Sequence, residues 1–160
     1  MTKKLSLIVF VFILAIINYS IYQKEDIVKN GKTIYLKLAP IDPRSLMQGD
    51  YMALRFQLED DIQKALKKEN YFLKNGEGRV LVKLDNNNLA AFSNLFIGQK
   101  MANNELILKY KVRGYQVSLG TNAFFFQEGE AKKYQNAKYG KFKLGKNHKI
   151  ILVDLVESLQ

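Results

Sequence analysis

The feature that most constrains this chain is an uncharged apolar run near its start, from Leu5 to Tyr22. A helix of this length, at roughly 1.5 Å per residue, spans about 27 Å, which is close to the hydrocarbon thickness of a bilayer. Lys3 and Lys4 precede the run, and Tyr19 and Tyr22 close it with rings that favour the headgroup region. The run therefore predicts a single membrane-spanning helix at the N-terminus.

A cleaved secretory leader is the alternative to a permanent anchor. Leaders carry small residues in an A-x-A arrangement before the cleavage site. The segment from Ala15 to Tyr22 instead holds bulky Ile and Tyr at most of those positions. We expect an uncleaved signal anchor, and the sequence alone leaves cleavage open.

The charges that flank the run predict its orientation. Lys3 and Lys4 lie before it, whereas Lys24 after it is outnumbered by Glu25 and Asp26. The more positive flank stays in the cytoplasm, so we expect the rest of the chain on the other side. In a bacterium this localisation is the inner (cytoplasmic) membrane, with the domain in the periplasm or at the cell exterior. The chain has no cysteine for a disulfide in that oxidising compartment, so its stability must come from its core.

The remainder of the chain has the size of one ordinary domain. We expect an anchor at residues 1–22, a short polar linker at 23–32 and a β-rich domain at 33–160. Helical periodicity, with acids first and bases last, predicts short helices at Glu59–Asn70 and Glu128–Lys138. Period-two alternation or apolar character predicts strands at Thr33–Leu38, Tyr51–Leu58, Arg79–Leu84, Leu89–Ile97, Leu106–Val112, Tyr115–Leu119, Tyr139–Leu144 and Lys149–Leu155.

These elements predict an α+β fold. It would be a mostly antiparallel β-sheet or barrel-like domain with two short helices, preceded by one transmembrane helix. Asp85 to Asn88 should form the turn of a hairpin, since Asn and Asp tolerate left-handed backbone geometry. The apolar stretch from Ile150 to Val153 suggests a central strand. Phe124 to Phe126 are expected in a strand of the core, and the alternative is an exposed wedge against lipid or a partner helix.

Positive charge gathers in the second half of the domain. The segment from Lys109 to Lys149 has ten Lys or Arg residues against Glu128 and Glu130. Such a face beside a membrane attracts anionic headgroups or acidic envelope polymers, whereas nucleic acid is not expected outside the cell. The alternative is that these lysines are ordinary solvated strand and turn residues. The basic face is expected to comprise Lys138, Lys141, Lys143, Lys146 and Lys149.

A loop bounded by prolines separates the first two predicted strands. Gly49 can adopt a positive φ there, and Asp50 can accept backbone N–H bonds. Pro43 stiffens the loop, and Arg44 lies within reach of Asp42 and Asp50 for a charge-assisted clamp. The loop is therefore either a structural corner or a recognition surface. Its binding candidates are Asp42, Pro43, Arg44, Gly49, Asp50, Tyr51 and Arg55.

The end of this loop resembles the signature of the GDYXXLXY family, which it matches at Gly49, Asp50, Tyr51 and Leu54. At the last position of the signature this chain has Phe56 in place of Tyr. The DPRSL stretch at 42–46 and the segments at 119–130 and 137–140 extend the likeness over most of the domain. The resemblance implies an N-terminal membrane helix, one outer domain and no assigned activity. It also implies an accessory role beside multi-span membrane proteins.

No catalytic constellation is recognisable. His148 is the only histidine, and Pro40 stands where a signal-peptidase-like motif would need its nucleophilic serine. We therefore expect a non-enzymatic accessory or interaction module for an integral membrane protein partner, without cofactor or metal. The alternatives are binding of anionic lipid or polymer by the basic face, a degenerate signal-peptidase-like β domain, or an unrecognised hydrolase.

Overall fold

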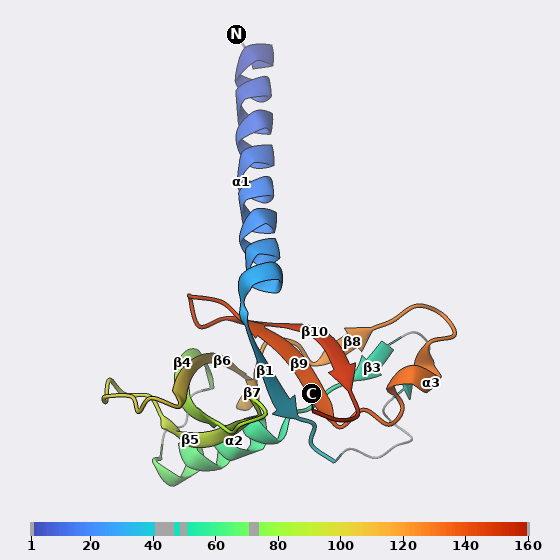
Figure 1. The fold of residues 1–160 in the computed structure, drawn as a ribbon. Coiled ribbons are helices and arrows are strands. Elements are labelled where there is room, and N and C mark those ends of the chain that lie inside the picture. The colour runs from blue at the N-terminus through green and yellow to red at the C-terminus, as the bar shows by residue number, and fades with distance from the viewer. Residues whose placement is uncertain (1, 41–46, 49–50, 71–73, 160) are drawn as a thin grey trace.

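The computed structural model describes residues 2–40, 47–48, 51–70 and 74–159. A long helix, α1 (Thr2–Asn30), stands clear of a β-rich domain that extends sideways from its base (Figure 1). Only Gly31 separates α1 from the first strand, β1 (Lys32–Lys37). The segment expected as a linker is therefore helical through Asn30. Two pairs of side chains at i and i+4 support this last part, Lys29 with Glu25 (3.2 Å) and Asn30 with Asp26 (2.7 Å).

Three antiparallel sheets build the domain. The first has the order β1-β9-β10 and includes β9 (Tyr139–Leu144) and β10 (Ile150–Val156). The second has the order β5-β4-β6-β7. It comprises β4 (Asn75–Leu84), β5 (Ala90–Leu95), β6 (Glu105–Arg113) and β7 (Gln116–Ser118). The third, of order β2-β3-β8, is small and joins β2 (Met47–Gln48), β3 (Tyr51–Ala53) and β8 (Ala123–Phe125).

The two larger sheets are connected to each other at two places. On one side Tyr35 of β1 forms a bridge with Leu89, and its N–H donates to the carbonyl of Asn88 (2.9 Å). On the other side the N–H of Lys109 in β6 donates to the carbonyl of His148 (3.0 Å) in the turn between β9 and β10. These connections curve the sheets around one core, which confirms the predicted α+β, barrel-like fold.

The core lies between the sheets and the helix α2 (Gln57–Lys68). Leu58, Ile62 and Leu66 form the buried stripe of α2, as the helical period predicts. The rings of Phe56 and Phe142 meet edge to face, with their centroids 5.1 Å apart. Gly140 makes this contact feasible, because a Cβ there would come within 2.8 Å of both rings. The fully buried residues of the sheets are Ile34, Leu36, Val80, Val82, Leu108 and Phe142.

Most predicted strands are confirmed within two or three residues at their ends. The hairpin of β4 and β5 turns at Asp85–Asn88 as expected, with Asn88 at φ 59. Asp85 fixes this turn, because its carboxylate accepts the N–H groups of Asn87 and Leu89, both at 2.8 Å.

The predicted strand from Tyr51 to Leu58 was wrong in its second half. β3 ends at Ala53, and α2 already begins at Gln57. Met52, Leu54, Phe56 and Leu58 are all buried, as the alternation predicts. Between β3 and α2 the chain keeps single backbone contacts in place of a regular ladder. The N–H of Leu54 donates to the carbonyl of Asn122, the carbonyl of Arg55 accepts the N–H of Ala39, and Phe56 forms a bridge with Leu38.

Other expectations also need correction. β10 lies at the edge of its sheet and is not central. Its residues are nevertheless all buried or half-buried, which explains the apolar sequence. The second helix is shorter than expected, since α3 covers only Ala131–Tyr134. The short strands β2 and β8 were not predicted, because two or three residues carry too little alternation to detect.

Candidate functional site

The family-like loop supplied most of the predicted binding residues. Asp42, Pro43, Arg44, Gly49 and Asp50 lie outside the described residues. Tyr51 and Arg55, the other two predicted residues, are described. Tyr51 is the first residue of β3, and Arg55 lies in the segment that joins β3 to α2. The clamp expected between Arg44 and the two aspartates is therefore not described.

Tyr51 belongs to an aromatic pair at the surface. Its ring lies 5.8 Å from that of Phe125, which is paired with it across β3 and β8. Phe125 is 75% exposed, whereas its neighbours Phe124 and Phe126 pack against Tyr134 at 5.0 and 5.6 Å. The favoured expectation of core packing is therefore wrong for Phe125, which is exposed as in the alternative.

The second half of the signature is structural. Leu54 is buried, and Phe56, which stands in place of the final Tyr, is 0% exposed. Its ring fills the core against Phe142, and its backbone begins α2. A hydroxyl at this position would need a hydrogen-bond partner inside the core, and phenylalanine avoids that requirement.

Glu59 connects the start of α2 to a distant part of the chain. Phe56 precedes the helix and has no side-chain oxygen to cap it, so the carboxylate of Glu59 accepts the Phe56 N–H (3.1 Å) instead. Its other oxygen accepts the N–H of Leu119 (2.7 Å). Glu59 is only 8% exposed, and this burial raises its pKa above the ordinary value, although the two N–H bonds act in the opposite direction.

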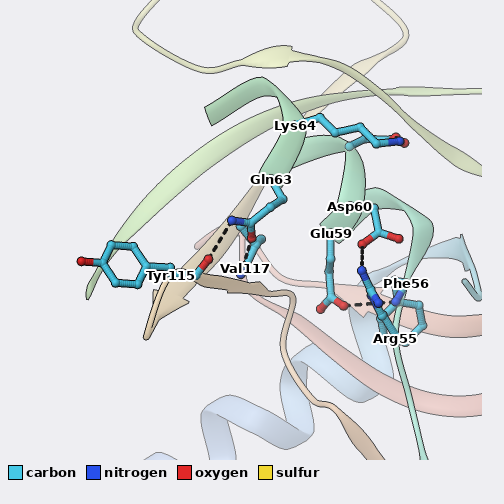
Figure 2. Close-up of polar contacts among 9 residues, drawn as sticks. Arg55, Phe56, Glu59, Asp60, Gln63, Lys64, Tyr115 and Val117 are labelled. Atoms are coloured by element: carbon cyan, nitrogen blue, oxygen red, sulfur yellow. Dashed lines mark hydrogen bonds and ion pairs between the residues drawn. The ribbon is translucent and has the colours of Figure 1, made fainter. Parts of the chain in front are cut away.

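Gln63, one helical turn further along, binds the edge of β7. Its Nε2 donates to the carbonyl of Tyr115 (2.7 Å), and its Oε1 accepts the N–H of Val117 (3.1 Å). Figure 2 shows Gln63 and Glu59 on the same side of α2, together with the ion pair between Arg55 and Asp60. The side chain of Gln63 thus takes the place of a neighbouring strand on the outer edge of this sheet.

A polar groove of about 560 Å³ opens beside these contacts. Among the lining residues that the structure describes, Ser118 alone carries a hydroxyl and none is histidine or cysteine. Two of its cations are engaged in ion pairs, Arg55 with Asp60 and Lys111 with Glu77 (2.9 Å). Such a lining can hold a polar ligand by hydrogen bonds. The lining residues are Leu54, Arg55, Glu59, Asp60, Gln63, Lys111, Arg113, Gln116, Val117, Ser118, Gly120 and Asn122.

Metal coordination and histidine chemistry find no further support in the described ranges. In that part of the chain, no three His, Cys, Asp or Glu side chains come together as a metal site. His148 lies in the turn between β9 and β10 at φ 62, where its backbone carbonyl binds β6.

The five lysines predicted as a basic face are spread along one hairpin. Lys138 precedes β9, and Lys141 and Lys143 alternate along it, half-buried. Lys146 and Lys149 lie in the turn at the opposite end of the strand. Since a strand of this length spans about 20 Å, the turn lysines form a group separate from Lys138.

Comparison with known families agrees with the layout of anchor and domain. The sequence model of a family described as "GDYXXLXY protein" matches residues 13–155. Neither curated proteins nor solved structures gave a match. Because the matched region includes both the second half of the apolar run and nearly all of the β-rich domain, the chain belongs to the GDYXXLXY family.

Proposed function

We propose that this protein is a single-pass membrane protein whose β-rich domain acts outside the cytoplasm as a non-enzymatic accessory module for an integral membrane protein. In a bacterium, the anchor would lie in the inner membrane and the domain in the periplasm. Lys3 and Lys4 on the N-terminal flank support this orientation.

The exposed surface of α1 is the observation that carries the proposal. The helix is long and apolar enough to cross a membrane, and its most apolar window is 0% buried. Large side chains such as Phe12, which is 66% exposed, point away from the helix on all sides. A water-soluble domain rarely exposes so much contiguous apolar surface. A bilayer would cover it.

The accessory role is supported by the aromatic pair of Tyr51 and Phe125. An exposed phenylalanine beside the signature tyrosine is the kind of anchor that protein interfaces bury. The pair lies on the small sheet, which begins at the family-like loop. An integral membrane partner fits best, because α1 keeps the domain within reach of the membrane surface.

Site-specific photo-crosslinking in living cells tests the proposal. A photoreactive phenylalanine replaces Phe125 in one variant and Tyr115 in a matched control, since Tyr115 is also exposed but lies at the β6–β7 turn. We expect an adduct with an integral membrane protein from position 125, retained in alkali-washed membranes, and much less from position 115. Equal yields at both positions, or adducts with soluble proteins alone, would contradict the proposal.

A further inference from the structure

The structure contains a second hollow, where α1 meets the domain. It has a volume of about 480 Å³ and lies between the last turn of α1 and the turn that joins β9 to β10. Two of its lining side chains, Lys32 and Lys146, are exposed cations. The lining comprises Asp26, Ile27, Asn30, Gly31, Lys32, Leu144, Gly145 and Lys146.

The β9–β10 turn is held firmly against the helix. Ile27 packs directly over Gly145, where an added Cβ would come within 2.7 Å of its side chain. Within the turn, the N–H of Gly145 donates to the carbonyl of Lys149 (2.9 Å), and the N–H of His148 donates to the carbonyl of Gly145 (3.0 Å). Lys146 therefore sits on an ordered turn beside α1.

The position of the hollow along α1 corresponds to the headgroup layer of a bilayer. Ile27 follows the end of the apolar run at Tyr22 by about 7 Å of helix rise. The polar layer on each side of the hydrocarbon is roughly 5–8 Å thick. The turn between β9 and β10 lies beside the base of α1 in Figure 1, so the turn would lie at the depth of this layer.

Charge at the hollow favours an anion. Lys149 lies near Lys146, because its carbonyl accepts the N–H of Gly145 (2.9 Å) and closes the turn. Lys143 pairs with Thr33 and therefore lies on the other face of the sheet from Lys32. Of the two acids in the last helical turns, only Glu25 has a cationic partner among the described residues. Asp26 keeps its negative charge, so the described lining of the hollow holds two lysines against one carboxylate. Asp26 accepts a bond from Asn30 (2.7 Å), and Glu25 pairs with Lys29 (3.2 Å).

We propose that this hollow binds the phosphate headgroup of an anionic phospholipid, with Lys32 and Lys146 as the residues that contact it. The inference rests on the proposed function, because the hollow reaches the headgroup layer only if α1 spans the membrane. Each lysine near such a surface contributes a factor of about five to the association. The bound lipid would fix the height and the rotation of the domain on the membrane.

The test uses the full chain reconstituted in phosphatidylcholine bilayers with trace spin-labelled lipids. Electron paramagnetic resonance gives the association of spin-labelled phosphatidylglycerol relative to spin-labelled phosphatidylcholine. The variant is Lys32→Gln with Lys146→Gln. The matched control is Lys67→Gln with Lys68→Gln, an equal charge change at the exposed end of α2, on the side of the domain away from α1 (Figure 1).

We expect the wild-type chain and the control to prefer phosphatidylglycerol, and the Lys32/Lys146 variant to lose up to about 25-fold of that preference. Added salt should weaken the preference in the wild type, since it screens charges at the membrane surface. Equal association of both lipids with the wild type, or the same loss in both variants, would overturn the inference. Flotation separates this failure from failure of the anchor, because a chain that does not float with vesicles contradicts the proposed function itself.

Discussion

Glu59 is the residue whose side chain connects most of the site. It accepts the Phe56 N–H at the start of α2 and also accepts the N–H of Leu119, which lies 60 positions further along the chain. The charges at Glu59, Asp60 and Asp61 suggested only a favourable helix dipole from the sequence. Phe56 is not one of the Ser, Thr, Asp or Asn residues that mark a capping box in a sequence, so the bond from Phe56 to Glu59 could not be predicted, and the second partner depends on how the β7–β8 segment folds back.

Replacing Glu59 with alanine should destabilise the protein, because the N–H groups of Phe56 and Leu119 would stay buried without an acceptor. A buried donor left unpaired costs roughly 1–3 kcal/mol. Urea denaturation of the full chain in detergent measures the change. Glu69→Ala is the control, since Glu69 is exposed at the end of α2 and should change the free energy of unfolding little. Equal effects of both substitutions would show that Glu59 has no such role.

The raised pKa of Glu59 also predicts a pH dependence. Between the unfolded pKa, near 4.5, and the higher folded pKa, the folded state binds more protons than the unfolded state. The contribution of Glu59 to the free energy of unfolding is therefore fully present below this pH window and decreases as pH rises through it. Glu77 and Glu105, whose pKa values are lowered, act in the opposite sense. They are retained in Glu59→Gln, so they cancel in a comparison with the wild type.

The measurement is the free energy of unfolding of the wild type minus that of Glu59→Gln, followed as pH rises from 4. We expect this difference to decrease. A difference that is flat or increases with pH would mean that burial does not dominate the pKa of Glu59.

At the scale of elements, the sequence predicts where apolar faces lie better than it predicts which strands pair. Met52, Leu54, Phe56 and Leu58 are buried as the alternation indicates, yet the regular strand ends at Ala53 and only isolated backbone contacts follow it. Alternation reports a buried face and carries no information about backbone partners. For the same reason, the apolar β10 suggested a central strand although it forms an edge.

The attachment of α2 to β7 belongs to this scale, and periodicity could not predict it. Gln63 is a polar position of the helix, and its partners at Tyr115 and Val117 are known only once β6 and β7 have folded as a hairpin. The aromatic pair of Tyr51 and Phe125 was missed for a similar reason, because it needs the short strands β3 and β8 side by side.

Gln63→Ala should expose the outer edge of β7. Each of its two hydrogen bonds contributes about 1 kcal/mol, so a total loss of roughly 1–2 kcal/mol is expected. Hydrogen exchange at the Val117 amide should become faster than in the wild type. Lys64→Ala is the control, since the side chain of Lys64 is largely exposed. Unchanged protection of Val117 in Gln63→Ala would show that the edge is held by something else.

On the scale of the whole molecule, α1 meets the domain where Ile27 packs over Gly145. Gly145→Leu should shift the direction of α1 relative to the sheets, because there is no room for a side chain at that position. The chain has no cysteine, so spin labels at Ser20→Cys and Asn136→Cys can report this geometry as a distance distribution.

We expect one narrow distribution in the labelled parent and a shifted or broadened one in Gly145→Leu. Adding Ile27→Ala to Gly145→Leu should restore much of the parent distribution, since it removes the side chain that clashes. A distance distribution that is the same in Gly145→Leu as in the labelled parent would mean that the β9–β10 hairpin does not set the direction of α1.

The central claim is that α1 spans a membrane and holds the domain on the side opposite the N-terminus. Labelling of single cysteines in intact spheroplasts by a membrane-impermeant maleimide tests it most directly. Ser158→Cys, at an exposed position of the domain, should react in intact spheroplasts, and Thr2→Cys should react only after the membrane is dissolved. Reaction of Thr2→Cys alone, or a protein recovered free of the membrane without its first helix, would contradict the account.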